Sequence, residues 1–233
     1  MGQKKLQRFA EIKSFRNVFE YPVHMRGQWH SFFGNDHPVV LELACGKGEY
    51  AIGLGRLYHS KNFIGVDLKG NRIWVGAKKA IEEGLTNVAF IRSQIDKIDN
   101  YFVPGEVSEI WITFPDPQLR TSKAKKRLTH PLFLRLYQKI LARGGQVHLK
   151  TDSPDLYNFT RTVLDLYGLA LEEDNADVYA SSAVTPELSI KTYYESLDIA
   201  KSSRVHYIRF QLPQEILVNK DEELKNILFE KEV

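Results

Sequence analysis

The sequence predicts an α/β fold in which helices cover both faces of a mostly parallel sheet. Short apolar runs rich in β-formers alternate with helical patterns over most of the chain, which is typical of βαβ crossover units. Hydrophobic residues make up 43% of the 233 residues and charged residues 26%, so one large globular domain is expected. Ligands of such sheets bind at the carboxyl ends of the strands, where we therefore look for functional residues.

The expected elements follow one another in a regular rhythm. The first strand, PVVLELAC, is an apolar run that ends just before two glycines, and a helix follows the glycines. Helices with apolar residues at helical spacing are expected at 49–58, 69–84, 132–141 and 156–167. Seven strands are expected at 38–45, 62–68, 87–93, 108–114, 146–151, 169–174 and 204–212.

Both ends of the chain differ from this regular middle. The first sixteen residues hold five basic residues and one acid, and aromatic residues are interleaved with them. The segment either packs its aromatics on the body of the protein or forms a basic arm that contacts a polyanion. We expect an arm at 1–37, one domain at 38–214, and a charged tail or short helix at 215–233.

Composition excludes several classes of protein. The formal net charge of +3 does not by itself indicate a nucleic-acid binder. The single cysteine, Cys45, cannot form an internal disulfide, and no apolar run approaches the roughly 20 residues of a membrane helix. The first residues lack the apolar region of a signal peptide, so a cytoplasmic protein without membrane contact is expected. The seven histidines show no metal-binding spacing, so no metal is expected.

The glycine loop after the first strand is the first candidate site. Gly46, Gly48 and Ala51 fit the pattern G-x-G-x-x-A, and Asp67 lies nineteen residues after Gly48. In a dinucleotide enzyme the glycines approach a pyrophosphate and the acid binds a ribose hydroxyl. An enzyme that uses S-adenosylmethionine would use the same acid for the same ribose. Alternatively, Gly46 and Gly48 only form a tight turn and have no role in binding.

Glu42, near the end of the first strand, helps to separate these possibilities. A carboxylate beside the loop would repel a pyrophosphate, whereas it would attract the ammonium and sulfonium groups of S-adenosylmethionine. The structural alternative is a salt bridge, because an acid inside an apolar run needs a partner.

The fourth strand ends abruptly at Phe-Pro-Asp116-Pro. Two prolines fix the backbone and remove two donors, so the strand stops and Asp116 is held at its carboxyl end. A basic run follows, with five cations in eight residues and no acid. Such a run is usually solvated, but beside this corner it is a candidate for binding phosphates. Its cations are Arg120, Lys123, Lys125, Lys126 and Arg127.

Taken together, these motifs resemble the bacterial tRNA (guanine-N7)-methyltransferases of the type that modifies guanine 46. The resemblance covers roughly residues 38–212. It depends on four blocks: ELACGKG with Asp67, FPDP with its basic run, HLKTD (148–152) with Tyr157, and Thr192-Tyr-Tyr-Glu195, which is similar to the T-x-Y-E motif of that family.

The resemblance implies a Rossmann-like class I methyltransferase fold, with a seven-stranded, mostly parallel sheet whose last strand is antiparallel. It implies S-adenosylmethionine as the donor, N7 of a guanine in tRNA as the acceptor, and a monomer or homodimer. The implied catalytic residue is Asp116, which would also border the cofactor. The implied cofactor contacts are Glu42, Gly46, Gly48, Asp67 and Gln94, with Asp96 as the alternative to Gln94. The implied tRNA contacts are Arg120, Asp152, Thr192, Tyr194 and Glu195, together with the basic run.

The chain departs from the family pattern at three positions. Ala44 replaces a common glycine, Gln118 replaces a usual tryptophan, and Arg120 replaces a usual lysine. Arginine keeps the charge but offers a planar fork of donors. These departures concern the details of the glycine loop and of guanine contact more than the reaction.

Three other functions remain open at this point. An amino-methyltransferase acting on adenine would have an aromatic residue directly after its Pro-Pro corner, whereas here Asp116 lies between the prolines. An NAD-dependent oxidoreductase is disfavoured by Glu42 and by the basic run. An inactive methyltransferase fold that only binds RNA is disfavoured because Asp67 and Asp116 are both present.

Overall fold

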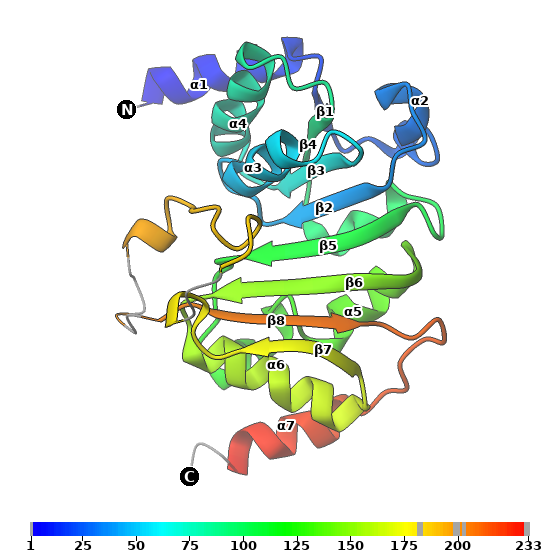
Figure 1. Cartoon of the computed structure of the whole chain (residues 1–233), viewed down its shortest axis with the longest axis vertical. Coiled ribbons are helices and arrows are strands. Elements are labelled where there is room, and N and C mark those ends of the chain that lie inside the picture. Colours follow the sequence, from blue (N-terminus) through cyan, green and yellow to red (C-terminus); the bar gives the residue numbers. More distant parts are fainter. Residues whose placement is uncertain (1, 181–183, 198–200, 202–203, 231–233) are drawn as a thin grey trace.

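The computed structural model describes residues 2–180, 184–197, 201 and 204–230, with side chains from residue 6 onward. Lys4 and Lys5, two basic residues of the expected arm, therefore have side chains outside the described part. The described residues form one sheet with the strand order β1-β4-β3-β2-β5-β6-β8-β7 (Figure 1). The strands are β1 (Val18–Glu20), β2 (Val39–Leu43), β3 (Asn62–Asp67), β4 (Val88–Arg92), β5 (Val107–Thr113), β6 (Leu141–Thr151), β7 (Ala170–Asn175) and β8 (His206–Gln211).

Only β8 runs against its neighbours in this sheet. It pairs antiparallel with both β6 and β7, while the pairs from β1 to β6 are parallel. The predicted α/β fold with an antiparallel last strand is therefore confirmed. The strand order reverses between β2 and β5, so the carboxyl ends of these two strands flank the point where a crevice forms in such sheets.

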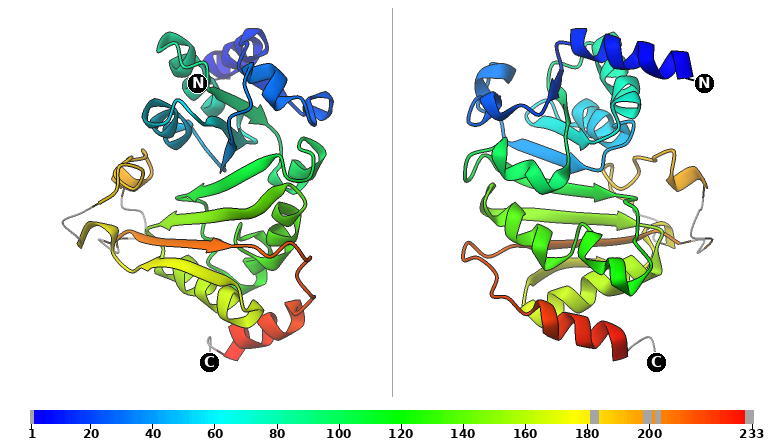
Figure 2. Two further views of the ribbon diagram at one scale, coloured as in Figure 1. Left: turned by 45° about the vertical axis from the view of Figure 1, so that its right-hand side comes forward. Right: turned by 180° about the vertical axis from the view of Figure 1, so that it is seen from behind.

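Helices pack on both faces of the sheet, and the helices on the two faces cover different halves of it (Figure 2). On one face, α3 and α4 pack over β2, β3 and β4, and on the opposite face α5 and α6 pack against β5, β6 and β8. The helices are α1 (Gly2–Glu11), α2 (Trp29–Phe33), α3 (Glu49–Leu57), α4 (Gly70–Glu82), α5 (Pro131–Gln138), α6 (Pro154–Tyr167) and α7 (Asp221–Glu230).

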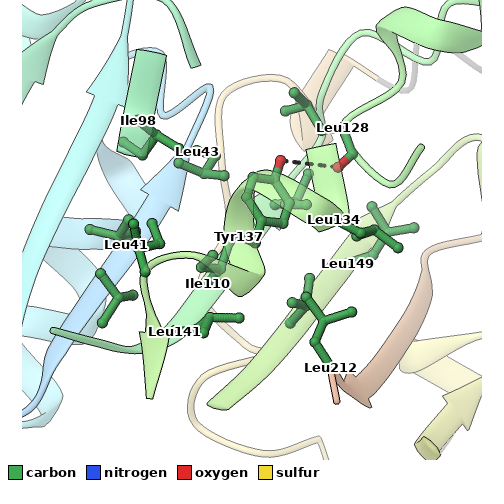
Figure 3. Packing of buried hydrophobic residues seen from close by; sticks show 14 of the residues in the cluster. Leu41, Leu43, Ile98, Ile110, Leu128, Leu134, Tyr137, Leu141, Leu149 and Leu212 are labelled. Carbon is green, nitrogen blue, oxygen red and sulfur yellow. Dashed lines mark hydrogen bonds between the residues drawn. The ribbon is translucent and has the colours of Figure 1, made fainter. Parts of the chain in front are cut away.

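The sheet separates two apolar clusters, because alternate residues of a strand point to opposite faces. In β2, Leu41 and Leu43 lie in the larger cluster, while Val40 lies in the smaller one. Figure 3 shows the larger cluster around Tyr137 of α5, whose hydroxyl donates to the Leu128 carbonyl at 3.0 Å. This bond fixes the end of the basic run to the core.

The structure has one strand more than the seven predicted. The additional strand, β1, comes from the expected N-terminal arm and forms one edge of the sheet, where it pairs with β4. Trp29 of the same segment is fully buried and donates from its ring nitrogen to the Tyr101 carbonyl at 2.9 Å. Trp29 thus packs on the body of the protein, as one of the two interpretations expected of these aromatics, whereas Tyr21 and Phe32 are partly exposed. The division into 1–37, 38–214 and 215–233 stays a proposal, and α7 occupies much of its last part.

The helix expected at 132–141 ends earlier than predicted. It stops at Gln138, and Leu141 is already the first residue of β6, where it pairs with Val107 of β5. Leu141 has the right spacing for the buried face of the helix, so periodicity alone assigns it to the wrong element. Pairing with the neighbouring strand decides its conformation.

Candidate active site

The carboxyl ends of β2, β3 and β4 surround a cavity of about 350 Å³. Asp67 lies at the end of β3, and Gln94 and Asp96 follow β4. The structure thus brings three of the predicted cofactor residues to one cavity, with Gln94 and Asp96 both at its wall. The remaining lining residues are Ala44, Leu68, Ser93, Ile95, Leu128 and Phe133.

The glycine loop between β2 and α3 turns sharply. Gly46 and Gly48 have φ angles of 57° and 67°, in the left-handed region that favours glycine. A Cβ at Gly48 would also lie 2.3 Å from the ring of Phe90, so only glycine fits there. Ala44 adopts a φ of 57° as well, although it has a Cβ. The alanine at this position thus lies in a backbone conformation that is strained for a residue with a Cβ.

Glu42 is buried in β2 and is 3% exposed. Its carboxylate accepts from the backbone N–H of Ala51, in the first turn of α3, at 2.8 Å and from the Thr113 hydroxyl at 3.1 Å. Burial raises the pKa of Glu42 to about 8, while the Ala51 and Thr113 bonds lower it in part. The bonds to Ala51 and Thr113 replace the salt bridge that the structural alternative expected.

Asp67 is held by two backbone donors. One carboxylate oxygen accepts from the Gly46 N–H at 2.9 Å and the other accepts from the Lys69 N–H at 2.7 Å. The carboxylate thereby links the glycine loop to the start of α4. Each oxygen keeps a free lone pair, so Asp67 can also accept from a ribose hydroxyl at the cavity.

These residues fit a nucleoside with a cationic tail better than a dinucleotide. The cavity offers Asp67, Gln94 and Asp96 as acceptors for hydroxyl and amino groups. Glu42 places a second acid beside the loop, and the described lining of the cavity contains no Lys or Arg to neutralise a pyrophosphate. This set of acceptors therefore suits S-adenosylmethionine.

The FPDP corner places Asp116 at the end of β5, next to β6. The backbone bends at Phe114 and Gln118, which both have positive φ angles, 46° and 49°. Asp116 is exposed, and its carboxylate accepts from the Gln118 N–H at 3.0 Å. Asp152 is half-buried just after β6. The two predicted acids thus follow neighbouring parallel strands at one edge of the sheet.

The basic run divides into exposed and buried cations. Arg120, Lys123, Lys125 and Lys126 are exposed around the short 3-10 helix Thr121–Lys126. Arg127 is 5% exposed and donates to the carbonyls of the corner itself. Its acceptors are the carbonyl oxygens of Pro117, Gln118 and Leu119, at 3.1–3.2 Å. Arg127 therefore holds the corner in place, and its contact with tRNA stays a prediction.

Comparison with known proteins adds to this geometry. Residues 36–206 match a family described as "Putative methyltransferase". A tRNA (guanine-N(7)-)-methyltransferase from Bacteroides thetaiotaomicron is 47% identical over 97% of this chain and 92% of its own length. One from Porphyromonas gingivalis is 49% identical over 86% of each chain. The chain belongs to the tRNA (guanine-N7)-methyltransferase family.

Solved structures of methyltransferases share the fold. The 16S rRNA methyltransferase KamB has a TM-score of 0.60 and 14% identity, over 80% of this chain and 94% of its own. A 30S ribosomal A1408 methyltransferase from an uncultured bacterium has a TM-score of 0.59 and 16% identity, over 80% and 93%. At these identities the likeness concerns the fold, which is that of class I methyltransferases.

In this member of the family, the T-x-Y-E motif lies in the connection between β7 and β8. Thr192 is buried, and its hydroxyl accepts from the Glu195 N–H at 3.1 Å. The Glu195 side chain is 8% exposed and pairs with Lys150. Tyr194 lies over the glycine loop, where a Cβ on Gly46 would be 3.6 Å from its ring. Direct tRNA contact by Thr192, Tyr194 and Glu195 stays a prediction, since two of these side chains are occupied by internal bonds.

Sequence reasoning missed three basic residues at this site. Lys150 is fully buried, Lys47 lies 3.8 Å from the ring centre of Tyr193, and the Arg72 guanidinium lies 5.3 Å from that of Tyr194. Lys150 carried a signal, because a lysine inside an apolar strand needs a partner just as Glu42 does. Lys47 and Arg72 carried none, because their partners are more than a hundred residues away.

No group of three or more His, Cys, Asp or Glu side chains in the described part of the chain is arranged to hold a metal ion. None of the helices in it is both long and apolar enough to span a bilayer.

Proposed function

We propose that this protein transfers the methyl group of S-adenosylmethionine to N7 of a guanine in tRNA. The observation that carries the proposal is the 47–49% identity to relatives named tRNA (guanine-N(7)-)-methyltransferase, over 86% or more of the chain. The acidic cavity beside an exposed basic corner agrees with it, because one region suits a cationic donor and the other a polyanion.

S-adenosylmethionine supplies an electrophilic methyl group on a sulfonium when it is bound. Glu42 and Asp67 would hold its cationic and ribose parts, with Gln94 or Asp96 beside its base and Gly46 and Gly48 leaving room for the backbone to approach. Guanine N7 has a lone pair and no proton, so the protein does not need a general base. Its task is to place N7 in line with the methyl group and the sulfur.

Asp116 is the residue that we assign to the guanine. It is exposed at the end of β5, so its carboxylate is available to the N1–H and amino donors of the base. The base gains positive charge as the new bond forms, and a fixed carboxylate stabilises that charge. Asp152, after the neighbouring strand, is placed to do the same from the side of β6.

The grip on tRNA is assigned to the exposed part of the basic run. Arg120, Lys123, Lys125 and Lys126 would contact phosphates, which position a nucleic acid without reading its sequence. Position 46 of the tRNA is proposed from the family resemblance. The cytoplasm, where tRNA is found, is the proposed location.

The test is mass spectrometry of nucleosides after unmodified tRNA is incubated with the protein and S-adenosylmethionine. We expect 7-methylguanosine, and we expect it to disappear when guanine 46 of the tRNA is replaced by adenine. N6-methyladenosine would instead support an amino-methyltransferase. Binding of NAD but not S-adenosylhomocysteine would support an oxidoreductase, and cofactor binding without any modified nucleoside would support an inactive RNA-binding protein.

A further inference from the structure

Lys150 is a charged residue in an unusual place. It lies one residue before the carboxyl end of β6, and its side chain is fully buried. The ammonium donates to the carbonyls of Leu188 at 2.8 Å and Ile190 at 3.0 Å, and it lies 3.1 Å from a carboxylate oxygen of Glu195. All three partners belong to the connection between β7 and β8, about forty residues along the chain. The lysine therefore joins this connection to the centre of the sheet.

The ammonium lies among aromatic rings. The rings of Tyr50, Phe114 and Tyr179 lie 5.5–5.6 Å from the nitrogen, and the Tyr179 hydroxyl is a further polar neighbour at 3.2 Å. Burial lowers the pKa of Lys150, and the charge of Glu195 raises it in part. Removing either partner of such a buried ion pair destabilises the protein, because the other charge is left uncompensated.

The connection that Lys150 holds also touches the glycine loop. We call residues 187–197 the anchored segment. Tyr193 stacks over the Lys47 ammonium and Tyr194 over the Arg72 guanidinium, and Tyr194 faces Gly46. At its other end the Glu187 carbonyl accepts from the Tyr50 hydroxyl at 2.6 Å. The anchored segment thus crosses from the end of β6 to the loop expected to hold the cofactor.

We propose that Lys150 is a positioning residue for the transfer reaction. Through Glu195 and the carbonyls of Leu188 and Ile190, it holds the anchored segment across the glycine loop, and this sets the place of the tRNA relative to the methyl donor. The inference rests on the proposed function. In this proposal Glu195, the glutamate of the T-x-Y-E motif, acts on the reaction indirectly. It holds Lys150 and the anchored segment rather than contacting the base.

The test compares Lys150→Met, Glu195→Gln and the double variant in steady-state methylation of tRNA. For Lys150→Met we expect the KM for tRNA to rise about tenfold, with the Kd of S-adenosylhomocysteine changed less than about threefold. The double variant should resemble Lys150→Met rather than show the product of the two single effects, because both changes break one link. Lys139→Met is the matched control, since it removes an exposed lysine whose partner, Asp99, does not line the cavity.

Several outcomes would overturn the proposal. The proposal fails if Lys150→Met has the same KM for tRNA and the same kcat as the wild type. It also fails if the effects of Lys150→Met and Glu195→Gln on the KM multiply in the double variant. A lowered melting temperature with unchanged KM below it would show a structural role only. If Lys150→Met does not fold, Tyr179→Phe removes a single hydroxyl from the cluster, and we expect the tRNA KM to rise two- to threefold. A wild-type protein that forms no 7-methylguanosine would refute the proposed function instead.

Discussion

The proposed cofactor side and the proposed tRNA side of this site differ in how their charged residues are exposed. On the cofactor side, the acids Glu42 and Asp67 are buried at the ends of β2 and β3. On the tRNA side, Asp116 and most of the basic run are exposed. The overall charge of +3 hides this separation. A buried site fixes its ligand by geometry, whereas an exposed basic surface attracts a polyanion in a way that salt weakens.

Both sides nevertheless use buried charges to fix loops. Glu42 and Asp67 accept from backbone N–H groups of the glycine loop and its neighbouring helices. Arg127 and Lys150 donate to backbone carbonyls of the FPDP corner and of the anchored segment. On the proposed cofactor side, acidic side chains thus accept hydrogen bonds from the backbone. On the proposed tRNA side, basic side chains donate hydrogen bonds to it. Changes on one side should therefore leave the other side intact.

The largest effect is expected from Asp116→Ala. Under the proposed role of Asp116 beside the base, loss of its carboxylate should lower kcat about 100-fold or more, because stabilisation of developing charge is lost. The Kd of S-adenosylhomocysteine should stay near that of the wild type, since the side chain is exposed and makes only a local bond to Gln118. Single-turnover methylation and calorimetric titration measure the two quantities.

Asp36→Ala is the control for that variant, since Asp36 is almost fully exposed just before β2, at the opposite edge of the sheet. Wild-type turnover by Asp116→Ala would remove Asp116 from the mechanism. Equal loss of turnover and of cofactor binding would mean that the two sides are not separable.

The next largest effect is expected from Glu42→Gln. The amide keeps the shape but not the charge that the carboxylate carries above its pKa of about 8, so at pH 9 the affinity for a cationic ligand should fall about 10–100-fold. Calorimetric titration with S-adenosylmethionine measures this loss, and turnover at saturating cofactor should recover. Unchanged affinity would show that Glu42 serves only the fold.

The same variant should change the pH dependence. The pKa of Glu42 is about 8 in the folded protein and its ordinary value is 4.5. The folded state therefore holds this proton more tightly, and the stability that it contributes is lost as pH rises from 4.5 through 8. In Glu42→Gln this loss of stability with rising pH should be absent. The melting temperature of the variant at pH 8 should therefore be higher than that of the wild type. Wild-type affinity for the cationic cofactor should increase up to about pH 8, and that of the variant should not.

Sequence reasoning succeeded where the signal is local. The strand ends, the glycines at 46 and 48 and the acid at 67 follow from short patterns, and the structure places all of them at one edge. Whether an individual cation is exposed does not follow from such patterns. Arg127 is a cation of the basic run like its neighbours in the sequence, yet it is buried and donates to backbone carbonyls of the FPDP corner. Contacts such as Lys150 with Glu195 join distant parts of the chain and need the fold.

A smaller effect is expected from changes to the exposed cations of the basic run. The double reversal Lys125→Glu and Lys126→Glu should weaken tRNA binding and reduce the slope of log Kd against log salt by about 2, if each lysine meets one phosphate. The control Lys139→Glu and Arg143→Glu makes the same change in net charge at the other end of the sheet. Filter binding between 50 and 300 mM salt measures both. Equal effects of the two pairs would show attraction by net charge without a basic site.

The smallest effect, Ala44→Gly, is confined to the backbone of the cofactor side. Ala44 holds a φ of 57°, which costs an L-residue roughly 1–2 kcal/mol, while glycine costs about 0.5–1 kcal/mol in the entropy of the unfolded chain. The free energy of unfolding should therefore increase by about 0.5–1 kcal/mol in urea denaturation. The same substitution at Ala51, inside α3, should instead decrease it by about 1 kcal/mol. A loss of stability at Ala44 would mean that its methyl group contributes more by packing against the core than its backbone loses by strain.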